Sequence, residues 1–291
     1  MAYRLSSPNR VLGQVRDIAL EIVATDVALV TKMKEEPDEG IHRFRRNVKR
    51  LRALIRLRRH ASVGSGSFEN AVLRECSRML AEARRALVML ETFESLALAP
   101  AERFEPMRRA LARRHRDAVS AALAPAVSSE LGSLLDSVKH HIEGWSEGEL
   151  SNKELSSAFG QSYAAARRAL KRAAKKPSSE RLHDFRKRVK AHGDQLELLK
   201  PLLGDDPIFK AGKLSKLGDL LGEERDLQEL RALLLEVGPS VLGTEATLEI
   251  IAELQARATP LAETALEVGE RRFAERPRHF RAEVTRLLAV A

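Results

Sequence analysis

The sequence predicts an all-α protein, and three observations support this fold class. Apolar residues recur at spacings of three and four along nearly the whole chain, which is the pattern of amphipathic helices. Long runs of alternating Val, Ile, Thr and Tyr are absent, so a large β-sheet is not expected. Charged residues make up 31% of the 291 residues and aromatic residues only 4%, which is typical of a helical protein rich in Ala, Leu, Arg and Glu.

Ten helices are expected from this periodicity and from the residues that interrupt it. In the first half of the chain the helices are expected at residues 8–34, 39–60, 68–96, 103–123 and 129–143. Pro37, the Gly64-Ser65-Gly66 segment, Pro100 and Pro125 separate them, because proline and glycine interrupt helices. Pro106 is expected to kink or shorten the fourth helix.

The second half of the chain is divided in the same way. Its helices are expected at residues 152–175, 179–203, 208–237, 244–272 and 277–289. Pro177, residues 204–207, Gly238-Pro239 and Pro277 mark the ends, and residues 144–148 separate the two halves. Pro260 is expected to kink or shorten the helix that contains it.

The chain contains an internal repeat with an offset of 141 residues. Residues 42–49 read HRFRRNVK and residues 183–190 read HDFRKRVK, so five of eight positions are identical. The same offset, without a gap, aligns Phe68 with Phe209, Leu73 with Leu214, Leu80 with Leu221, Glu82 with Glu223 and Arg84 with Arg225. We therefore expect two homologous helical bundles, residues 1–146 and 147–291, related by a pseudo-two-fold axis.

Each copy of the repeated segment predicts a helix with an apolar stripe on one side and a cationic stripe on the other. At about 100° per residue, Phe44 and Val48 lie opposite His42, and Phe185 and Val189 lie opposite His183. The first cationic row consists of His42, Arg45, Lys49, Arg52 and Arg56. The second cationic row consists of His183, Arg186, Lys187 and Lys190.

The first cationic row lies in a segment with an unusual charge. Residues 41–60 carry nine Lys and Arg and no acid, and the formal net charge of the chain is +9. Neighbouring like charges destabilise a helix, so a bound anion or acidic residues of other helices, such as Glu82, Glu223 and Glu224, should cover this face. A solvated basic face without a function is the third reading. Arg pairs with phosphate oxygens through two hydrogen bonds, which favours phosphate as the anion. Two long rows offer more cations than one phosphate can use, which favours a chain of phosphates.

Other sequence features narrow the function. Neither a GxxxxGK[ST] loop nor a GxGxxG turn is present, and the basic segments contain few aromatic residues for base stacking. Duplex nucleic acid remains an alternative ligand through contacts to its backbone alone. The one cysteine, Cys76, excludes an internal disulfide and a Cys-based zinc site, and we expect it to be a buried apolar residue in a protein of a reducing compartment.

No apolar run reaches the roughly 18 residues of a membrane-spanning helix. The N-terminal segment, residues 1–8, is short and polar and lacks the apolar core of a signal peptide. We therefore expect a cytoplasmic protein without a membrane partner.

These motifs resemble those of a known family. The block formed by His42, Arg45, Lys49, Arg50 and Arg52 resembles the conserved histidine α-helical domain family, abbreviated CHAD. Residues 183–190 resemble its second-half motif, residues 217–227 (LGDLLGEERDL) its third signature, and residues 80–88 a first-half counterpart. The resemblance covers nearly the whole chain. It implies two similar four-helix-type bundles with a basic surface or pore between them, which bind inorganic polyphosphate, and association with polyphosphate granules.

Position by position, the resemblance implies a binding site without a cofactor. Its residues would be His42, Arg45, Lys49, Arg50, Arg52, Arg84, His183, Arg186, Lys187, Lys190 and Arg225, joined by Lys213 and Lys216 before the third signature. The chain departs from the family pattern at residues 191–194 (AHGD), where a basic and an aromatic residue are usual, and at Arg85, where Asp is usual. The second row is therefore expected to be shorter.

Two further readings concern chemistry at this site. Glu39 and His42, like Glu180 and His183, have the Glu-x-x-His spacing of di-iron bundles, but the surrounding cations would repel a metal ion. A phosphohydrolase acting on polyphosphate would need acids to hold Mg²⁺ beside the phosphates, and the rows lack them. We therefore expect a non-enzymatic polyphosphate-binding protein, with a nucleic-acid-binding module or a phosphohydrolase as the alternatives. A purely structural reading predicts no binding at all.

Overall fold

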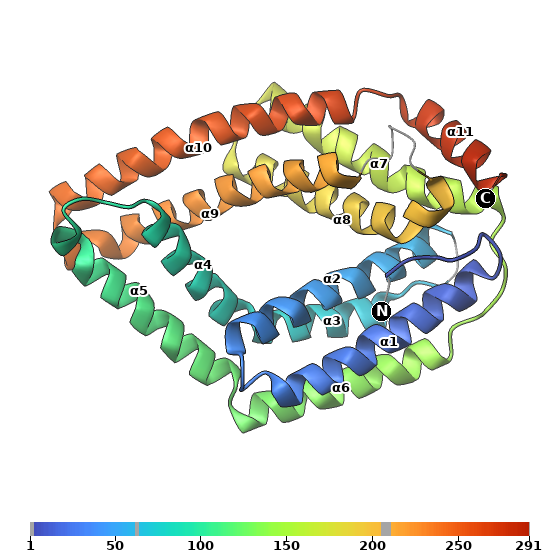
Figure 1. The fold of residues 1–291 in the computed structure, drawn as a ribbon, viewed down its shortest axis with the longest axis horizontal. Helices are drawn as coiled ribbons and strands as arrows, with labels where there is room; N and C mark the ends of the chain where they lie inside the picture. Colours follow the sequence, from blue (N-terminus) through green and yellow to red (C-terminus); the bar gives the residue numbers. More distant parts are fainter. Residues whose placement is uncertain (1–2, 62–63, 205–210, 291) are drawn as a thin grey trace.

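The computed structural model describes residues 3–61, 64–204 and 211–290, without the side chains of residues 211–213. The described residues form eleven α-helices and no strand, which confirms the all-α prediction. The helices are α1 (Val11–Lys32), α2 (Pro37–His60), α3 (Ser67–Met79), α4 (Ala81–Ser95), α5 (Ala101–Ala122), α6 (Pro125–Glu143), α7 (Asn152–Lys175), α8 (Ser179–Leu203), α9 (Ala211–Leu242), α10 (Thr244–Arg272) and α11 (Pro277–Leu288). In Figure 1 they form an elongated frame, with α10, α5, α6 and α7 outside and α2, α8 and α9 inside.

Three predicted helix boundaries were wrong. The helix expected at 68–96 is two helices that meet at Leu80, whose side chain is fully buried. Gly238-Pro239 does not end α9, which continues to Leu242 and stops at Gly243, where φ is 81°. Glycine adopts this left-handed conformation without steric cost. The helix expected at 129–143 begins at Pro125, because proline is pre-organised for the first helical position.

The helix order of residues 11–143 recurs in residues 152–288, and the starts of α1, α2 and α5 lie within two residues of the 141-residue offset from their counterparts, while α11 begins 152 residues after α6. Residues 11 and 152 begin α1 and α7, and α2 and α8 begin at residues 37 and 179. The α3–α4 pair corresponds to α9, α5 to α10, and α6 to α11. The main difference is that α9 is continuous where its counterpart is broken at Leu80.

The hydrophobic core forms two clusters, and each contains side chains from both halves of the sequence. The larger cluster joins α1, α2, α3 and α6 to α7, α8 and α11, with Phe44, Phe159 and Phe185 among its buried side chains. The smaller cluster lies where α4 and α5 meet α9 and α10, and it includes Phe93 and Leu234. The two ends of the molecule are therefore held by separate cores.

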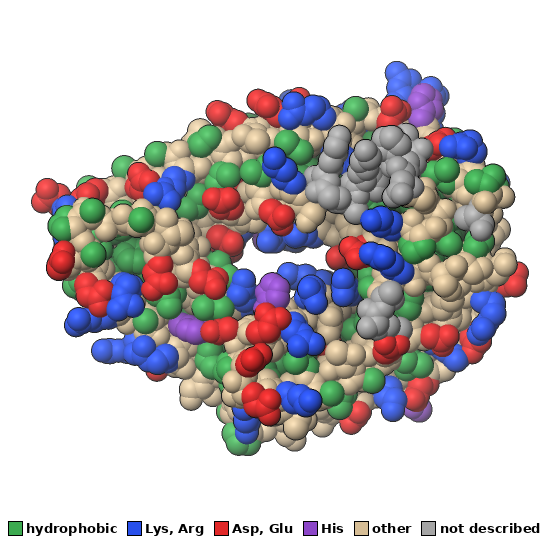
Figure 2. Space-filling view, viewed as in Figure 1, with side chains coloured by type: hydrophobic (Ala, Val, Ile, Leu, Met, Phe, Trp, Pro, Cys, Tyr) green, Lys and Arg blue, Asp and Glu red, His purple; other side chains and the backbone are tan. Residues whose placement is uncertain are grey.

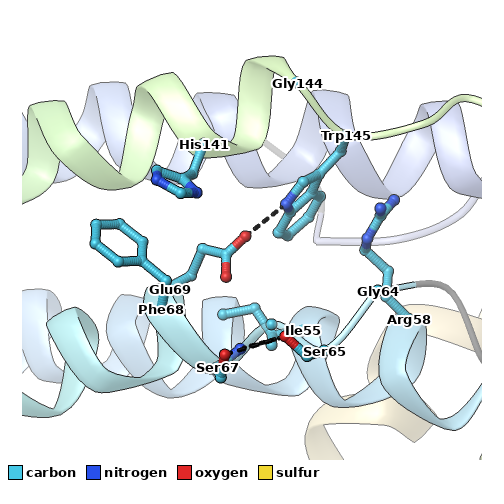
Figure 3. A pocket seen from close by; sticks show the side chains of 11 residues that line it. Ile55, Arg58, Gly64, Ser65, Ser67, Phe68, Glu69, His141, Gly144 and Trp145 are labelled. Atoms are coloured by element: carbon cyan, nitrogen blue, oxygen red, sulfur yellow. Dashed lines mark hydrogen bonds between the residues drawn. The ribbon is translucent and has the colours of Figure 1, made fainter.

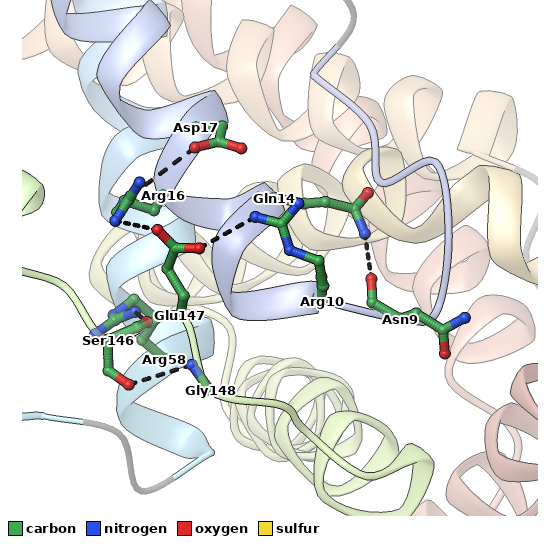
Figure 4. A network of polar contacts seen from close by, with 9 residues as sticks. All are labelled: Asn9, Arg10, Gln14, Arg16, Asp17, Arg58, Ser146, Glu147 and Gly148. Carbon is green, nitrogen blue, oxygen red and sulfur yellow. Dashed lines mark hydrogen bonds and ion pairs between the residues drawn. The ribbon is translucent and has the colours of Figure 1, made fainter.

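The segment between the halves is packed onto the first half. Trp145 is buried, and its Nε1 donates a hydrogen bond of 2.8 Å to Glu69 Oε1. The Arg58 guanidinium lies 4.3 Å from the centre of the indole ring. Glu147 next to it forms ion pairs with Arg10 at 3.1 Å and Arg16 at 2.5 Å (Figure 4). These contacts fix residues 145–147 against α1, α2 and α3.

Cys76 and Asp26 are two buried titratable groups of the first half whose pKa is strongly raised. Cys76 is fully buried, as predicted, and burial raises the pKa of its thiol to about 12. Asp26 is also fully buried, and its Oδ1 accepts a hydrogen bond of 2.7 Å from Asn47 Nδ2. Asp26 Oδ2 has no hydrogen-bond partner among the described residues. Burial raises the pKa of Asp26 to about 7, because the charged carboxylate is poorly solvated there.

Within the described part of the chain, no single helix has the length and apolar composition to cross a membrane. One bent pair, α5 with α6, passes the same test when its two helices are taken together across an angle of 56°.

Candidate functional site

An opening passes through the middle of the molecule between α2 and the α8–α9 pair (Figures 1 and 2). Figure 2 shows Lys and Arg side chains on both sides of it, with a His side chain at its edge. The two repeated helices form opposite walls, because their apolar stripes, with Phe44 and Phe185 fully buried, pack into the core. The cationic rows are left on the faces that border the opening.

The wall formed by α2 and α4 carries the first cationic row. His42 is exposed, and Arg45 is half-buried and donates a hydrogen bond of 2.5 Å to the carbonyl oxygen of Ser77. Arg84 on α4 lies near both side chains. Partial burial and the charge of Arg84 lower the pKa of His42, which favours the neutral imidazole in the absence of an anion.

The wall formed by α8 and α9 carries the second cationic row. His183 and Arg186 are half-buried, and Lys187 is exposed. Burial, followed by the charge of Arg225 on α9, lowers the pKa of His183. His183 Nδ1 and Arg186 Nε are buried and have no hydrogen-bond partner among the described residues. Unpaired buried polar atoms of this kind cost free energy, so the second row is not fully satisfied by contacts among the described residues.

The two rows face one another across the opening. Burial lowers the pKa of Lys49 to about 8, and the next largest cause is the positive charge of Arg186 on the opposite wall. Lys190 repels Lys49 in the same way. Charges lower one another's pKa only at short range, so the side chains of α2 and α8 converge on one space. Because these like charges repel, the pair of walls is suited to a bound polyanion.

Not every predicted site residue joins this space. Arg50 packs its guanidinium 4.9 Å from the centre of the Tyr3 ring, and Arg52 Nε donates a hydrogen bond of 2.8 Å to Asn70 Oδ1. Lys216 is exposed, and the side chain of Lys213 lies outside the described residues. The structure therefore brings together His42, Arg45, Lys49 and Arg84 with His183, Arg186, Lys187, Lys190 and Arg225.

Three carboxylates of α9 lie beside the second row, and the sequence reasoning missed them. Lys190 Nζ lies 3.5 Å from Asp219 Oδ1, and Arg225 Nε donates a hydrogen bond of 2.7 Å to Glu229 Oε1. Asp226 is attracted most strongly by Arg186. The spacing of four between Arg225 and Glu229 was a signal for the second contact. Glu82 was one of the acids expected to neutralise the first cationic row, and it instead forms an ion pair with Arg114.

Two of these carboxylates, Asp219 and Asp226, line a cavity of about 320 Å³ beside the second cationic row. Thr92 and Ser95 of α4 contribute hydroxyl groups to it, and Arg257 of α10 lines it while donating hydrogen bonds to the carbonyl oxygens of Ser95 and Leu96. The remaining polar residues of its lining are Arg186, Lys190, Asp219, Glu223 and Asp226. The cavity thus joins one helix of the first half to three helices of the second half.

The CHAD domain family matches residues 17–235 of the chain. The chain belongs to the CHAD family. The structure is similar to that of PptA from Streptomyces chartreusis, with a TM-score of 0.64 and 18% sequence identity over 91% of this chain and 99% of that chain. This similarity shows a shared fold that includes helices beyond residue 235. No curated protein matches the chain.

Other histidines of this CHAD chain lie away from the opening. His192 is buried among Phe159, Tyr163 and Phe273, and burial lowers its pKa to about 3. His115 Nε2 lies 2.8 Å from Asp38 Oδ1. Among the residues that the structure describes, no three His, Cys, Asp or Glu side chains are grouped so that they could hold a metal ion.

A second cavity in the CHAD fold, of about 350 Å³, lies between α3 and the end of α6 (Figure 3). Its walls include the rings of Phe68, His141 and Trp145, and the buried carboxylate of Glu69 points between them. Phe68 and His141 are stacked with their ring centres 3.9 Å apart. A carboxylate among apolar rings does not favour a phosphate, so this cavity is separate from the cationic site.

Two glycines of the third CHAD signature allow the second row to lie flat against α9. A Cβ at Gly222 would be 3.3 Å from Arg186 Nη2, and one at Gly218 would be 3.2 Å from Lys190 Nζ. Larger side chains at these positions would push the cations away from the helix. The glycines therefore fix the width of the opening at this wall.

Gly222→Leu is expected to weaken polyanion binding about tenfold without changing any charge. Leu favours a helix by up to about 1 kcal/mol over Gly, so the helix should persist while the Arg186 guanidinium is displaced. The control is Gly132→Leu in α6, where an added Cβ meets nothing within 4 Å. Binding by calorimetry and helicity by circular dichroism check the prediction, and equal affinities for the two variants would contradict it.

Proposed function

We propose that this CHAD protein binds inorganic polyphosphate in the central opening. The observation that carries the proposal is the convergence of Lys49 with Arg186 and Lys190, which are cations on opposite walls. Arg and Lys donate charge-assisted hydrogen bonds to successive phosphates, and a nearby polyanion favours the protonated forms of His42 and His183. The part of the first cationic row that borders the opening, from His42 to Lys49, spans about 11 Å of helix and faces the second row, so a chain of phosphates uses the two rows better than a single phosphate.

We also propose that the two halves are related by a pseudo-two-fold axis through the opening. The support is the matching order of helices at the 141-residue offset and the opposed positions of the repeated helices α2 and α8. Residues 1–146 and 147–291 would then form one binding unit. Each half supplies one wall, in the way each subunit of a homodimer supplies half of a shared site.

The proposed protein is a binding protein and not an enzyme, and it acts in the cytoplasm on polyphosphate granules. The carboxylates beside the second row are engaged by cations, Asp219 by Lys190 and Glu229 by Arg225, and are therefore poorly placed to bring Mg²⁺ to a scissile bond. Release of phosphate from long chains in the presence of Mg²⁺ or Mn²⁺ would overturn this part of the proposal.

Polyphosphate binding is expected to weaken at least about a hundredfold when the salt concentration rises from 50 to 200 mM, because several cations release counterions together. Calorimetric titration with long-chain polyphosphate at both salt concentrations measures the effect. Competition with duplex DNA at equal phosphate concentration separates the alternative. Displacement of polyphosphate by the DNA would contradict the preference for polyphosphate and favour a nucleic-acid-binding module.

A further inference from the structure

The two cationic rows are aligned by the sequence repeat, but their electrostatic surroundings differ. Lys49 corresponds to Lys190 at the offset of 141 residues. Lys190 forms an ion pair with Asp219 on α9. Lys49 forms no ion pair with any carboxylate in the part of the chain that is described, although Asp194 attracts it at longer range. The cation of the first row is therefore open to an external anion, and its counterpart is already occupied.

The arginines of the two walls differ in the same way. Arg225, which corresponds to Arg84, donates a hydrogen bond to Glu229, and Glu229 also lies 3.7 Å from Arg85 of α4. Arg186 corresponds to Arg45. Among the positive charges near Asp226, that of Arg186 attracts the carboxylate most strongly. Arg45 instead uses one donor on a backbone carbonyl, which leaves its charge uncompensated.

The sequence explains why only one wall has these carboxylates. At the offset of 141 residues, Asp219 corresponds to Arg78, Asp226 to Arg85 and Glu229 to Val88. The three acids of α9 therefore have no acidic counterpart in the first half. The asymmetry is a property of the sequence, independent of how any one side chain is oriented.

We propose that the opening contains two unequal anion sites, an open one on the first cationic row and a latent one on the second, where Asp219 and Glu229 pair with Lys190 and Arg225, beside Asp226 in the same wall, until a phosphate chain displaces them. This inference rests on the proposed function and adds the order in which the two anion sites are occupied. A polyphosphate chain binds the α2 wall first and then crosses to α8 and α9. A short phosphate chain occupies the first site only, so the α9 carboxylates make the protein selective for long chains.

The carboxylates are accessible enough to be displaced. Asp219 is 69% exposed and Lys190 is 42% exposed, and ion pairs with this exposure contribute little free energy. Arg225 and Glu229 are 29% and 25% exposed, so their pair is held more firmly. The second site therefore opens in steps, beginning at Asp219.

Asp226 couples this displacement to the uptake of a proton. It faces Arg186 from α8 and Arg84 from α4, with Arg225 and Glu229 on its own helix, and Arg257 of α10 lines the same cavity. Burial raises the pKa of Asp226 to about 6. A phosphate chain that arrives beside it favours the protonated carboxyl group, which no longer competes for Arg186.

The test uses tripolyphosphate as the short probe and long-chain polyphosphate as the long one, with the full chain in calorimetric titrations. The variant is Asp219→Asn, Asp226→Asn and Glu229→Gln combined. We expect the wild type to bind one tripolyphosphate per chain and the variant to bind two, with an affinity for the long chain that is about tenfold higher because three repulsive charges are removed. The single variant Asp219→Asn changes an exposed side chain and should keep the fold, and it should bind a second tripolyphosphate more weakly than the triple variant does.

The matched control removes three exposed acids from the outer face of α10, by Glu263→Gln, Glu267→Gln and Glu270→Gln, and it should keep the wild-type stoichiometry. Two equal tripolyphosphate sites in the wild type, or the same change in the control as in the α9 variant, would overturn the inference. Failure of the wild type to bind long-chain polyphosphate would instead overturn the proposed function, so the two failures are distinguishable.

Discussion

Polyphosphate binding is expected to disappear when four cations of the opening are replaced together by glutamate: Arg45, Lys49, Arg186 and Lys190. The change reverses the charge on both walls at the point where they converge, so a phosphate chain meets repulsion along its whole path. Helicity should persist, because the buried stripes that hold α2 and α8, such as Phe44 and Phe185, are untouched. Calorimetry measures the binding, and circular dichroism with thermal unfolding measures the fold.

The control for this variant makes the same change of net charge on the outside of the molecule. Four exposed cations of α7 and of its C-terminal end are replaced by glutamate: Arg168, Lys171, Lys175 and Lys176. Most of the binding should survive, because only long-range attraction is reduced. Equal loss in both variants would mean that net charge alone attracts the ligand. Unfolding of the first variant would mean that the four cations serve internal ion pairs or packing.

The second large effect concerns stability. Asp26→Asn is expected to make the protein more stable than the wild type at pH 8 by about 4 kcal/mol, since one pKa unit corresponds to about 1.4 kcal/mol and the pKa of Asp26 is raised from its usual value near 4 to about 7. Between these pH values the folded wild type holds a proton that the unfolded chain has released. Its free energy of unfolding therefore falls as pH rises through this range and levels off above about pH 7.

Urea unfolding of the wild type and of Asp26→Asn at pH 4, 6 and 8 checks this prediction. The two proteins should have similar free energies of unfolding at pH 4, where the carboxyl group is protonated, and they should diverge as pH increases. Asn keeps the shape of the side chain and an oxygen for the hydrogen bond from Asn47. A difference that does not change with pH would show that Asp26 stays in one protonation state.

The helices and the cationic walls could be predicted from the sequence because both follow from local periodicity. The spacing of Phe44 and Val48 fixes which face of α2 is buried, and the opposite face then carries Arg45 and Lys49. The repeat predicted that the two halves pair as the subunits of a dimer do, and the resemblance to the CHAD family implied the basic surface between them where Arg186 lies.

The remaining features depend on tertiary packing. Arg52 lies on the predicted cationic face, but α3 passes beside it and supplies Asn70 as a hydrogen-bond partner. The break at Leu80 allows that residue to be buried, and nothing in the local pattern distinguishes it from its counterpart Leu221, which α9 contains without a break. The sequence of the second row contains no carboxylate partner for Lys190, and the partners of Lys190 and Arg225, Asp219 and Glu229, lie on α9. A pairing between helices depends on tertiary packing and could not be predicted from the row alone.

The two hydrophobic cores have a topological consequence. Because side chains of both halves pack together at each end of the molecule, the walls are joined on either side of the opening and form a closed ring. The two walls cannot separate unless the packing of one hydrophobic core is disrupted. A linear polymer that runs through such a ring must be threaded from a free end, whereas a circular polymer can only rest against its rim. Dissociation of a threaded chain requires sliding along its length, so its rate should decrease as the chain grows.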